Sequence, residues 1–304
     1  MPQVTLREIL AANQDPNRVV GAFNIHNLEF IRGVVQAAES EKTPVIMMIN
    51  EAVLKYGRID CLGVAALSAA KRGSADCGYG GSRHRPCVPE RVPGRGMDVM
   101  YDGSALPFEQ NAAQTRKWSV MPRTRSLCRR RDRCAGILED GDDGVEQHLT
   151  TVREAVAFYE QTSVDVLAIS VGNVHGLYHG EANINVERIE EIHAALGKVP
   201  VVMHGGSDIP IETIRRSVRA GIRKFNIATD LKIAYAQTMR ELMHASPLPI
   251  QPLQLFPVVA KAVEEQARHK IRIFNGRMKD ETGVCCFHLR NKVRSYRIQR
   301  REHP

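Results

Sequence analysis

Two histidines stand where short apolar runs of the chain end, and their type and spacing suit metal binding. His175 follows the run Val164–Val171, and His204 closes the run Val199–His204; a glycine comes directly after each histidine. Imidazole nitrogens are common zinc ligands. A single histidine at the end of a strand is usually structural, but two on neighbouring strands could hold a metal while nearby backbone amides stay accessible. The pair therefore indicates a candidate metal site.

Two turns near these histidines have the composition of an anion site. Gly205-Gly206-Ser207 precedes one expected helix, and Asn226 stands shortly before Thr229-Asp230 at the start of another. Backbone amides and the positive end of a helix favour a phosphate group. The alternative is a pair of tight turns with ordinary helix caps. Two such turns on consecutive strands favour the phosphate site.

Alternating strands and helices are expected to position these residues. Six short runs rich in Val and Ile are typical of strands buried on both faces: Val20–Ile25, Pro44–Asn50, Asp98–Asp102, Val164–Val171, Val199–His204 and Ile222–Ala228. Helical patterns lie between them, over residues 28–41, where Asn27 can cap the helix, and over 148–161, 187–196, 211–220 and 230–243. This alternation predicts a parallel α/β fold, and 304 residues fit one large barrel or two ordinary domains.

The net charge of +8 comes from two stretches that differ from their surroundings. Residues 119–133 hold six arginines against one aspartate, which gives +5, and residues 277–304 hold eight basic residues against three acids, again +5. The seven cysteines, an odd number without a CxxC spacing, are expected to be free thiols. No apolar run is long enough to span a membrane, and Arg7 and Glu8 lie where a signal peptide would be apolar. We expect a cytoplasmic location.

Two segments interrupt the alternation. Residues 72–97 and 119–140 show neither strand nor helix periodicity, although each lies where the alternation requires a strand. Native loops of this length inside a compact domain are uncommon. The chain from about Asn275 to its end is also unpatterned and basic.

Five stretches carry a resemblance to a known family: GAFNIHNLEF, DVMYDGSALPFEQN, AISVGNVHGLYHGE, VVMHGGSDIP and GIRKFNIATDL. They resemble the class II, zinc-dependent ketose-bisphosphate aldolases of the fructose- and tagatose-bisphosphate type. The resemblance covers roughly residues 1–71, 98–118 and 141–274. It implies one TIM (β/α)8 barrel over residues 1–274, followed by a basic tail over 275–304. It also implies a homodimer or homotetramer and a lyase of carbohydrate metabolism and glycolysis that uses Zn²⁺. The implied reaction is the reversible cleavage of a ketose 1,6-bisphosphate to dihydroxyacetone phosphate and glyceraldehyde 3-phosphate.

Position by position, the resemblance assigns both metal ligands and substrate contacts. His175 and His204 match two of the family's three zinc-ligand histidines, and Asp102 matches an acidic position near the metal. The substrate-contacting positions, of which the last three bind the dihydroxyacetone phosphate portion, are Gly176, Gly205, Gly206, Ser207, Asn226, Ala228 and Thr229. Zinc would act as a Lewis acid on the ketone while the phosphate turns hold the reacting carbons in place.

Two family motifs are missing from this chain. An Asp-His pair after the third strand should supply the proton-transferring carboxylate and the remaining zinc ligand, and a Glu-Gly-Glu-like stretch should follow at the fifth strand. The Asp of the pair would fall near Arg85-Pro86, so the catalytic residue is unknown. Both motifs fall in the two irregular segments.

We hypothesise that a shift of the reading frame accounts for both losses. His84–Cys87 can be encoded CAT CGA CCA TGC, which read one nucleotide later gives Ile-Asp-His. Cys128–Ala135 can likewise be encoded so that the same shift gives Val-Glu-Gly-Glu-Ile-Gly-Ala. Genuine insertions are the alternative. The hypothesis predicts weak zinc binding, low turnover, disrupted third and fifth strands and poor folding.

Two other functions stay open. A barrel without the Asp-His pair could be a catalytically inactive subunit or binding partner. The arginine-rich residues 123–133 could bind nucleic acid, but no aromatic residues interleave with them, and such runs are usually solvated. We therefore expect a phosphorylated sugar as partner, and neither nucleic acid nor a membrane.

Overall fold

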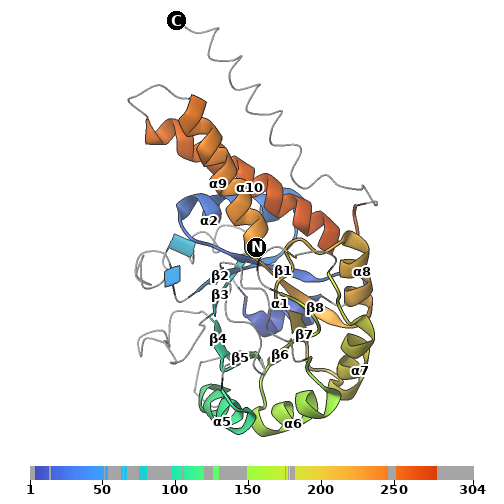
Figure 1. Cartoon of the computed structure of the whole chain (residues 1–304). Helices are drawn as coiled ribbons and strands as arrows, with labels where there is room; N and C mark the ends of the chain where they lie inside the picture. The colour runs from blue at the N-terminus through green and yellow to red at the C-terminus, as the bar shows by residue number, and fades with distance from the viewer. Residues whose placement is uncertain are drawn as a thin grey trace, which may run out of the picture.

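Eight parallel strands form a closed barrel in their order along the chain (Figure 1). The computed structural model describes residues 4–13, 15–50, 52–53, 63, 65–66, 75–80, 98–104, 106–119, 126–129, 149–174, 176, 178, 182–245 and 251–278. The strands are β1 (Val20–Asn24), β2 (Val45–Ile49), β3 (Ala75–Gly80), β4 (Asp98–Asp102), β5 (Ser126–Arg129), β6 (Val166–Ile169), β7 (Val201–Met203) and β8 (Ile222–Ile227). Pairing of β1 with β8 closes the ring. The expected TIM barrel is confirmed.

Strands β3 and β5 lie inside the two segments that show no periodicity. The β3 backbone pairs with β2 from Val45↔Ala75 to Ile49↔Tyr79 and then with β4. The β5 backbone pairs with β4 and β6. The structure thus differs from the expectation that these strands would be disrupted. A parallel ladder uses main-chain donors and acceptors, which residues of any side-chain pattern supply.

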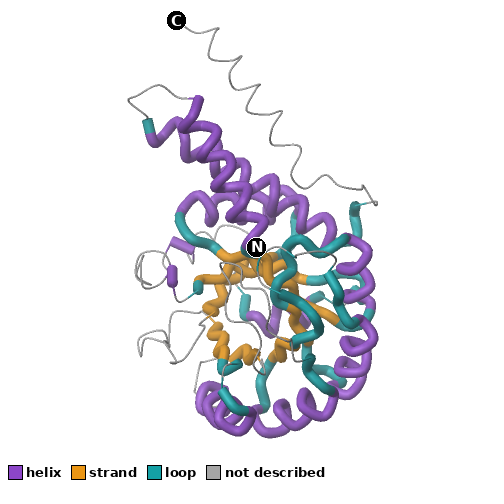
Figure 2. Tube along the Cα trace, in the orientation of Figure 1, coloured by secondary structure: helices purple, strands orange, loops and turns teal. Residues whose placement is uncertain are grey.

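The helices other than α1 lie outside the ring of strands (Figure 2). The described helices are α1 (Leu6–Ala12), α2 (Leu28–Glu41), α5 (Phe108–Ser119), α6 (Val152–Thr162), α7 (Val186–Leu196), α8 (Ile211–Arg219), α9 (Thr229–Ala245) and α10 (Pro252–Phe274). The predicted cap of α2 is present, since Asn27 Oδ1 accepts from the Phe30 N–H at 3.2 Å. Helices α1, α5 and α10 were not predicted. None of the helices that the structure describes has the length and apolar character to cross a bilayer.

Two apolar clusters build the core. One fills the barrel, where Val20, Met48 and Val202 on the strands meet Leu6, Ile9 and Leu10 of α1. In the view of Figure 1, α1 lies inside the outline of the ring, and its buried residues pack on the inward-facing strand residues. The second cluster lies between the strands and the outer helices. Because α1 and the apolar strand residues fill the barrel, polar strand residues stand above them at the carboxyl ends, where barrel enzymes place their chemistry.

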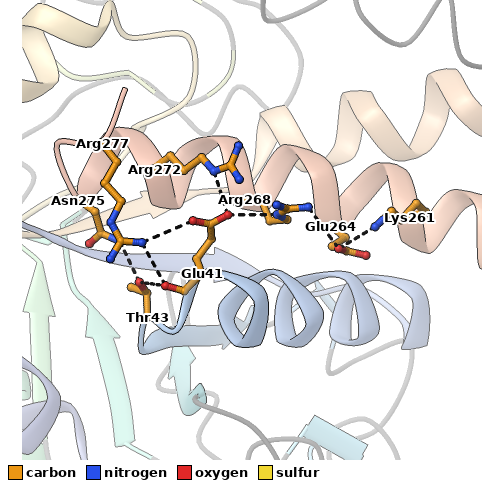
Figure 3. A network of polar contacts seen from close by, with 8 residues as sticks. All are labelled: Glu41, Thr43, Lys261, Glu264, Arg268, Arg272, Asn275 and Arg277. Carbon is orange, nitrogen blue, oxygen red and sulfur yellow. Dashed lines mark hydrogen bonds and ion pairs between the residues drawn. The ribbon is translucent and has the colours of Figure 1, made fainter. Parts of the chain in front are cut away.

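Helix α10 packs across α2 at very close range. A Cβ on Gly33 would come within 2.8 Å of the Ala260 carbonyl oxygen and the Glu264 backbone nitrogen, so α2 needs glycine here. At the carboxyl end of α2, Glu41 is 7% exposed. Its Oε1 lies 2.9 Å from Arg272 Nε and 3.2 Å from Arg268 Nε (Figure 3). Arg277 adds a third cation at 3.6 Å from Oε2. The network joins α10 and the residue Arg277 that follows it to the carboxyl end of α2.

Substituting Glu41→Gln is expected to lower the free energy of unfolding by about 2 kcal/mol, because one neutral amide would face three guanidinium groups. Urea denaturation measures the change. Glu191→Gln is the matched control, since Glu191 pairs with a single arginine, Arg188, at 2.9 Å and is itself 57% exposed. An equal loss in both variants would contradict a special role of the Glu41 network.

Candidate active site at the carboxyl ends of the strands

His204 and Asn226 come together at the carboxyl ends of β7 and β8. His204 directly follows β7 and is 3% exposed; Asn226 lies in β8 and is 8% exposed. The Asn226 Nδ2 atom is 3.1 Å from both the Nδ1 and the Nε2 atoms of His204. A predicted zinc ligand and a predicted substrate contact thus lie side by side.

The turn after β7 is tied to β8 and to α9. The Gly206 N–H donates to the Asn226 carbonyl at 2.9 Å, and Ser207 Oγ accepts from the Asp230 N–H at 3.3 Å. A Cβ on Gly206 would lie 2.9 Å from the Phe225 ring, which accounts for the glycine. The Gly206 amide therefore joins the two predicted phosphate turns and is not free for a ligand. Gly205, with φ +63°, has the left-handed backbone that glycine adopts readily.

Helix α9 begins at Thr229, as the anion-site prediction required. Ala228 precedes it, and its carbonyl accepts from the Lys232 N–H at 3.1 Å. Asp230 in the first turn is 9% exposed, and its Oδ2 lies 2.8 Å from the Nζ of Lys270 on α10, itself 3% exposed. A carboxylate at the helix start would repel a phosphate, but the Lys270 ammonium balances its charge. Helix α10 thus contributes to this turn through Lys270.

The segment after β6 is hydrogen-bonded to the turn after β7. Asn173 Oδ1 accepts from the Val171 N–H at 2.9 Å, while Asn173 Nδ2 donates to the His204 carbonyl at 3.1 Å. Gly176 has φ +99°, a backbone conformation in which a Cβ is strained. His175, the other predicted histidine ligand, lies outside the described residues, as does the Arg85-Pro86 position.

The Tyr178 hydroxyl bridges the segment after β6 and the turn after β7 by hydrogen bonds. It accepts from the Val174 N–H at 3.2 Å and donates to the Gly205 carbonyl at 3.4 Å. The Tyr178 N–H donates to Asp208 Oδ2 at 3.1 Å. Burial raises the pKa of Tyr178 to about 12, with a smaller contribution from the negative charge of Asp208. The phenol therefore keeps its proton, and its donor role, throughout the neutral range.

A Tyr178→Phe variant should lose both hydroxyl hydrogen bonds and about 1 kcal/mol of stability. Hydrogen exchange at the Val174 amide should accelerate, and the acceleration should be the same from pH 6 to pH 9 because the phenol is neutral at both. Tyr235→Phe is the control, since that hydroxyl accepts from Asn27 Nδ2 at 3.1 Å on another part of the barrel. Unchanged hydrogen-exchange protection of the Val174 amide in Tyr178→Phe would refute this bridging role of the Tyr178 hydroxyl.

Asp102 stands at the carboxyl end of β4, three strands from β7 in the ring. Its Oδ1 accepts from the Ser104 N–H at 3.0 Å, and its side chain is half-buried. Within the described residues, no three His, Cys, Asp or Glu side chains gather closely enough to hold a metal. His204 and Asp102 are suitable zinc donors by type, and His175, the other predicted ligand, lies outside the described residues.

Sequence reasoning missed Lys224, Asn173 and Tyr178. Lys224 had a signal: it stands two residues before Asn226 in an apolar strand run, so both share one face of the strand. The sequence holds no comparable signal for Asn173 and Tyr178, because their roles depend on backbone groups contributed by another turn.

Comparison with known proteins finds relatives that match most of the chain. The family model described as "Fructose-bisphosphate aldolase class-II" matches residues 4–279. A sulfofructosephosphate aldolase of Alkalicoccus urumqiensis is 30% identical, over 86% of this chain and 93% of that protein. A probable fructose-bisphosphate aldolase of Bacillus subtilis (strain 168) is also 30% identical, over 90% and 98%. The crystal structure of the YdjI aldolase from Escherichia coli K12 is 27% identical, with a TM-score of 0.76 over 92% of this chain and 100% of that one. The chain belongs to the class II fructose-bisphosphate aldolase family.

Proposed function

We propose that this chain is a zinc-dependent lyase that cleaves fructose or tagatose 1,6-bisphosphate reversibly to dihydroxyacetone phosphate and glyceraldehyde 3-phosphate. The observation that carries the proposal is the junction of His204, Asn226 and the Gly206 turn at the carboxyl ends of β7 and β8. The similarity to a sulfofructosephosphate aldolase supports a phosphorylated ketose as the substrate class. We further propose a cytoplasmic glycolytic enzyme that is a homodimer or homotetramer and binds neither nucleic acid nor membranes.

In this proposal, each part of the site has a separate task. His204, His175 and Asp102 would hold Zn²⁺, which would supply a Lewis acid for the ketone substrate. Asn226, Ala228 and Thr229 hold the dihydroxyacetone phosphate portion, together with Gly176, Gly205, Gly206 and Ser207; Gly206 contributes by fixing the turn, because its amide is already bonded. No residue of the described part is assigned the proton transfer at the C4 hydroxyl. Since general acid–base catalysis contributes about 10²–10⁴-fold, we expect slow turnover.

Zinc titration and an assay of dihydroxyacetone phosphate release test the proposal. We expect Zn²⁺ to bind and a slow release from a ketose 1,6-bisphosphate that stops on chelation and returns when Zn²⁺ is added. Fructose and tagatose bisphosphates are compared directly, with sulfofructose phosphate as a third substrate. A folded chain that binds no zinc and releases no triose phosphate would contradict the proposal. That result would instead support the inactive barrel, which the missing Asp-His pair favours.

A further inference from the structure

Lys224 is a lysine enclosed in the barrel interior. It is 0% exposed, and in the strand register it stands beside Val20 of β1 and Val202 of β7. Both valines belong to the apolar cluster inside the barrel. A buried lysine costs considerable free energy unless polar groups compensate it, so a retained one calls for a specific role.

The contacts of Lys224 connect it to the candidate active site. Its Nζ donates a short hydrogen bond to Asn226 Oδ1 and lies 3.6 Å from Met48 Sδ. On the other side of the same amide, Asn226 Nδ2 lies 3.1 Å from the His204 ring. The three side chains thus form a row from the barrel interior to its carboxyl end.

The chemistry of the row sets the orientation of the Asn226 amide. The Nζ of Lys224 donates to Asn226 Oδ1, so the carbonyl oxygen of Asn226 faces the lysine. A flipped amide would set the Nδ2 donors against the N–H groups of the lysine. Asn226 therefore presents N–H groups, and not its oxygen, on the His204 side. In an aldol cleavage the ketone oxygen gains negative charge, which hydrogen-bond donors stabilise and acceptors destabilise.

We propose that Lys224 is a positioning residue that locks the Asn226 amide with its oxygen toward the barrel interior and its N–H groups toward the site. This inference rests on the proposed function, because Asn226 is the substrate contact through which Lys224 acts. Lys224 itself touches no substrate. Its position one layer below the site explains why a charged residue stands inside an apolar barrel.

Lys224→Met is the decisive variant, because methionine fills a similar volume among apolar neighbours and removes the donor. We expect an unfolding midpoint equal to or above that of the unchanged chain, with kcat lowered roughly 10- to 100-fold and KM nearly unchanged. In an Asn226→Ala background, Lys224→Met should have almost no further effect on kcat. Met48→Leu, which removes the sulfur contact and keeps the bulk, should leave kcat as it is.

Several outcomes would overturn the proposal. An equal loss of kcat from Lys224→Met with and without Asn226 would show that Lys224 acts by another route, and an unchanged kcat would show that it does not act at all. If Lys224→Met fails to fold, Lys224→Gln, which keeps an N–H donor group, replaces it and should retain more activity than Asn226→Ala.

A readout independent of turnover separates this inference from the proposed function. The two side-chain amide protons of Asn226 should give one well-dispersed pair of NMR resonances in the unchanged chain and two exchanging sets in Lys224→Met. If the unchanged chain cleaves no ketose phosphate, the proposed function fails, and the NMR comparison still decides whether Lys224 orients the amide. One undisturbed set of resonances in Lys224→Met would refute the orientation.

Discussion

Replacing His204 by alanine is expected to weaken Zn²⁺ binding by more than about 100-fold and to reduce triose phosphate release below detection. Removing even a residue that only supports a ligand costs about 10- to 100-fold in metal affinity, so the loss of a ligand should cost more. His204 is 3% exposed at the end of β7, so alanine there would leave a buried gap without a nitrogen donor. Isothermal titration with Zn²⁺ gives the affinity, and a coupled assay gives the rate.

The matched control is His244→Ala, since His244 is exposed near the carboxyl end of α9. Zinc binding and turnover should be unchanged in that variant. A His204→Ala protein that still binds Zn²⁺ like the unchanged chain would show that the metal lies elsewhere. Circular dichroism tests whether both variants fold; the hydrogen bond from Asn173 goes to the His204 backbone carbonyl and does not depend on the His204 side chain.

The parts of the fold that the sequence predicts are those in which one local pattern is sufficient. Val45–Ile49 is an unbroken apolar run and forms a strand, and Asn27 stands before an amphipathic run and caps α2. Strands β3 and β5 carry no such pattern, since their place comes from main-chain pairing with strands on both sides. Helix α10 was missed, although Pro252 at its first turn is a start signal; Pro257 inside the helix obscured the pattern.

The candidate site shows the same division. The glycine-rich turn and the start of α9 at Thr229 are local features, and both were predicted. The bond between the Gly206 N–H and the Asn226 carbonyl joins two turns, so one turn's composition does not show that its amide is occupied. The ion pair of Lys270 with Asp230 is harder still to predict from the sequence, because Lys270 lies on a helix that was not predicted.

Restoring the alternate reading frame over residues 72–97 and 119–140 should raise turnover roughly 10²–10⁴-fold, the range of a general acid–base group, and yield one tightly bound zinc per protomer. The shifted frame would introduce an Asp-His pair at the positions of Arg85 and Pro86 and a Glu-Gly-Glu stretch near Arg129–Arg131. These positions lie largely outside the described residues, so the expectation rests on the sequence. Sequencing the encoding DNA across codons 72–143 is the first step, and GAC-CAT should be found in the alternate frame.

Two further chains make the comparison decisive. Restoring only residues 119–140 leaves the Asp-His pair missing and should recover little turnover, whereas restoring only residues 72–97 should recover most of the zinc affinity. Adding His204→Ala to the fully restored chain should remove the gain, since the site would again have only two of the three proposed histidine ligands. If the DNA spells no Asp-His pair in any frame, both segments are genuine protein. The closed ring through β3 and β5 would then favour a barrel that keeps its phosphate turns without a complete zinc site.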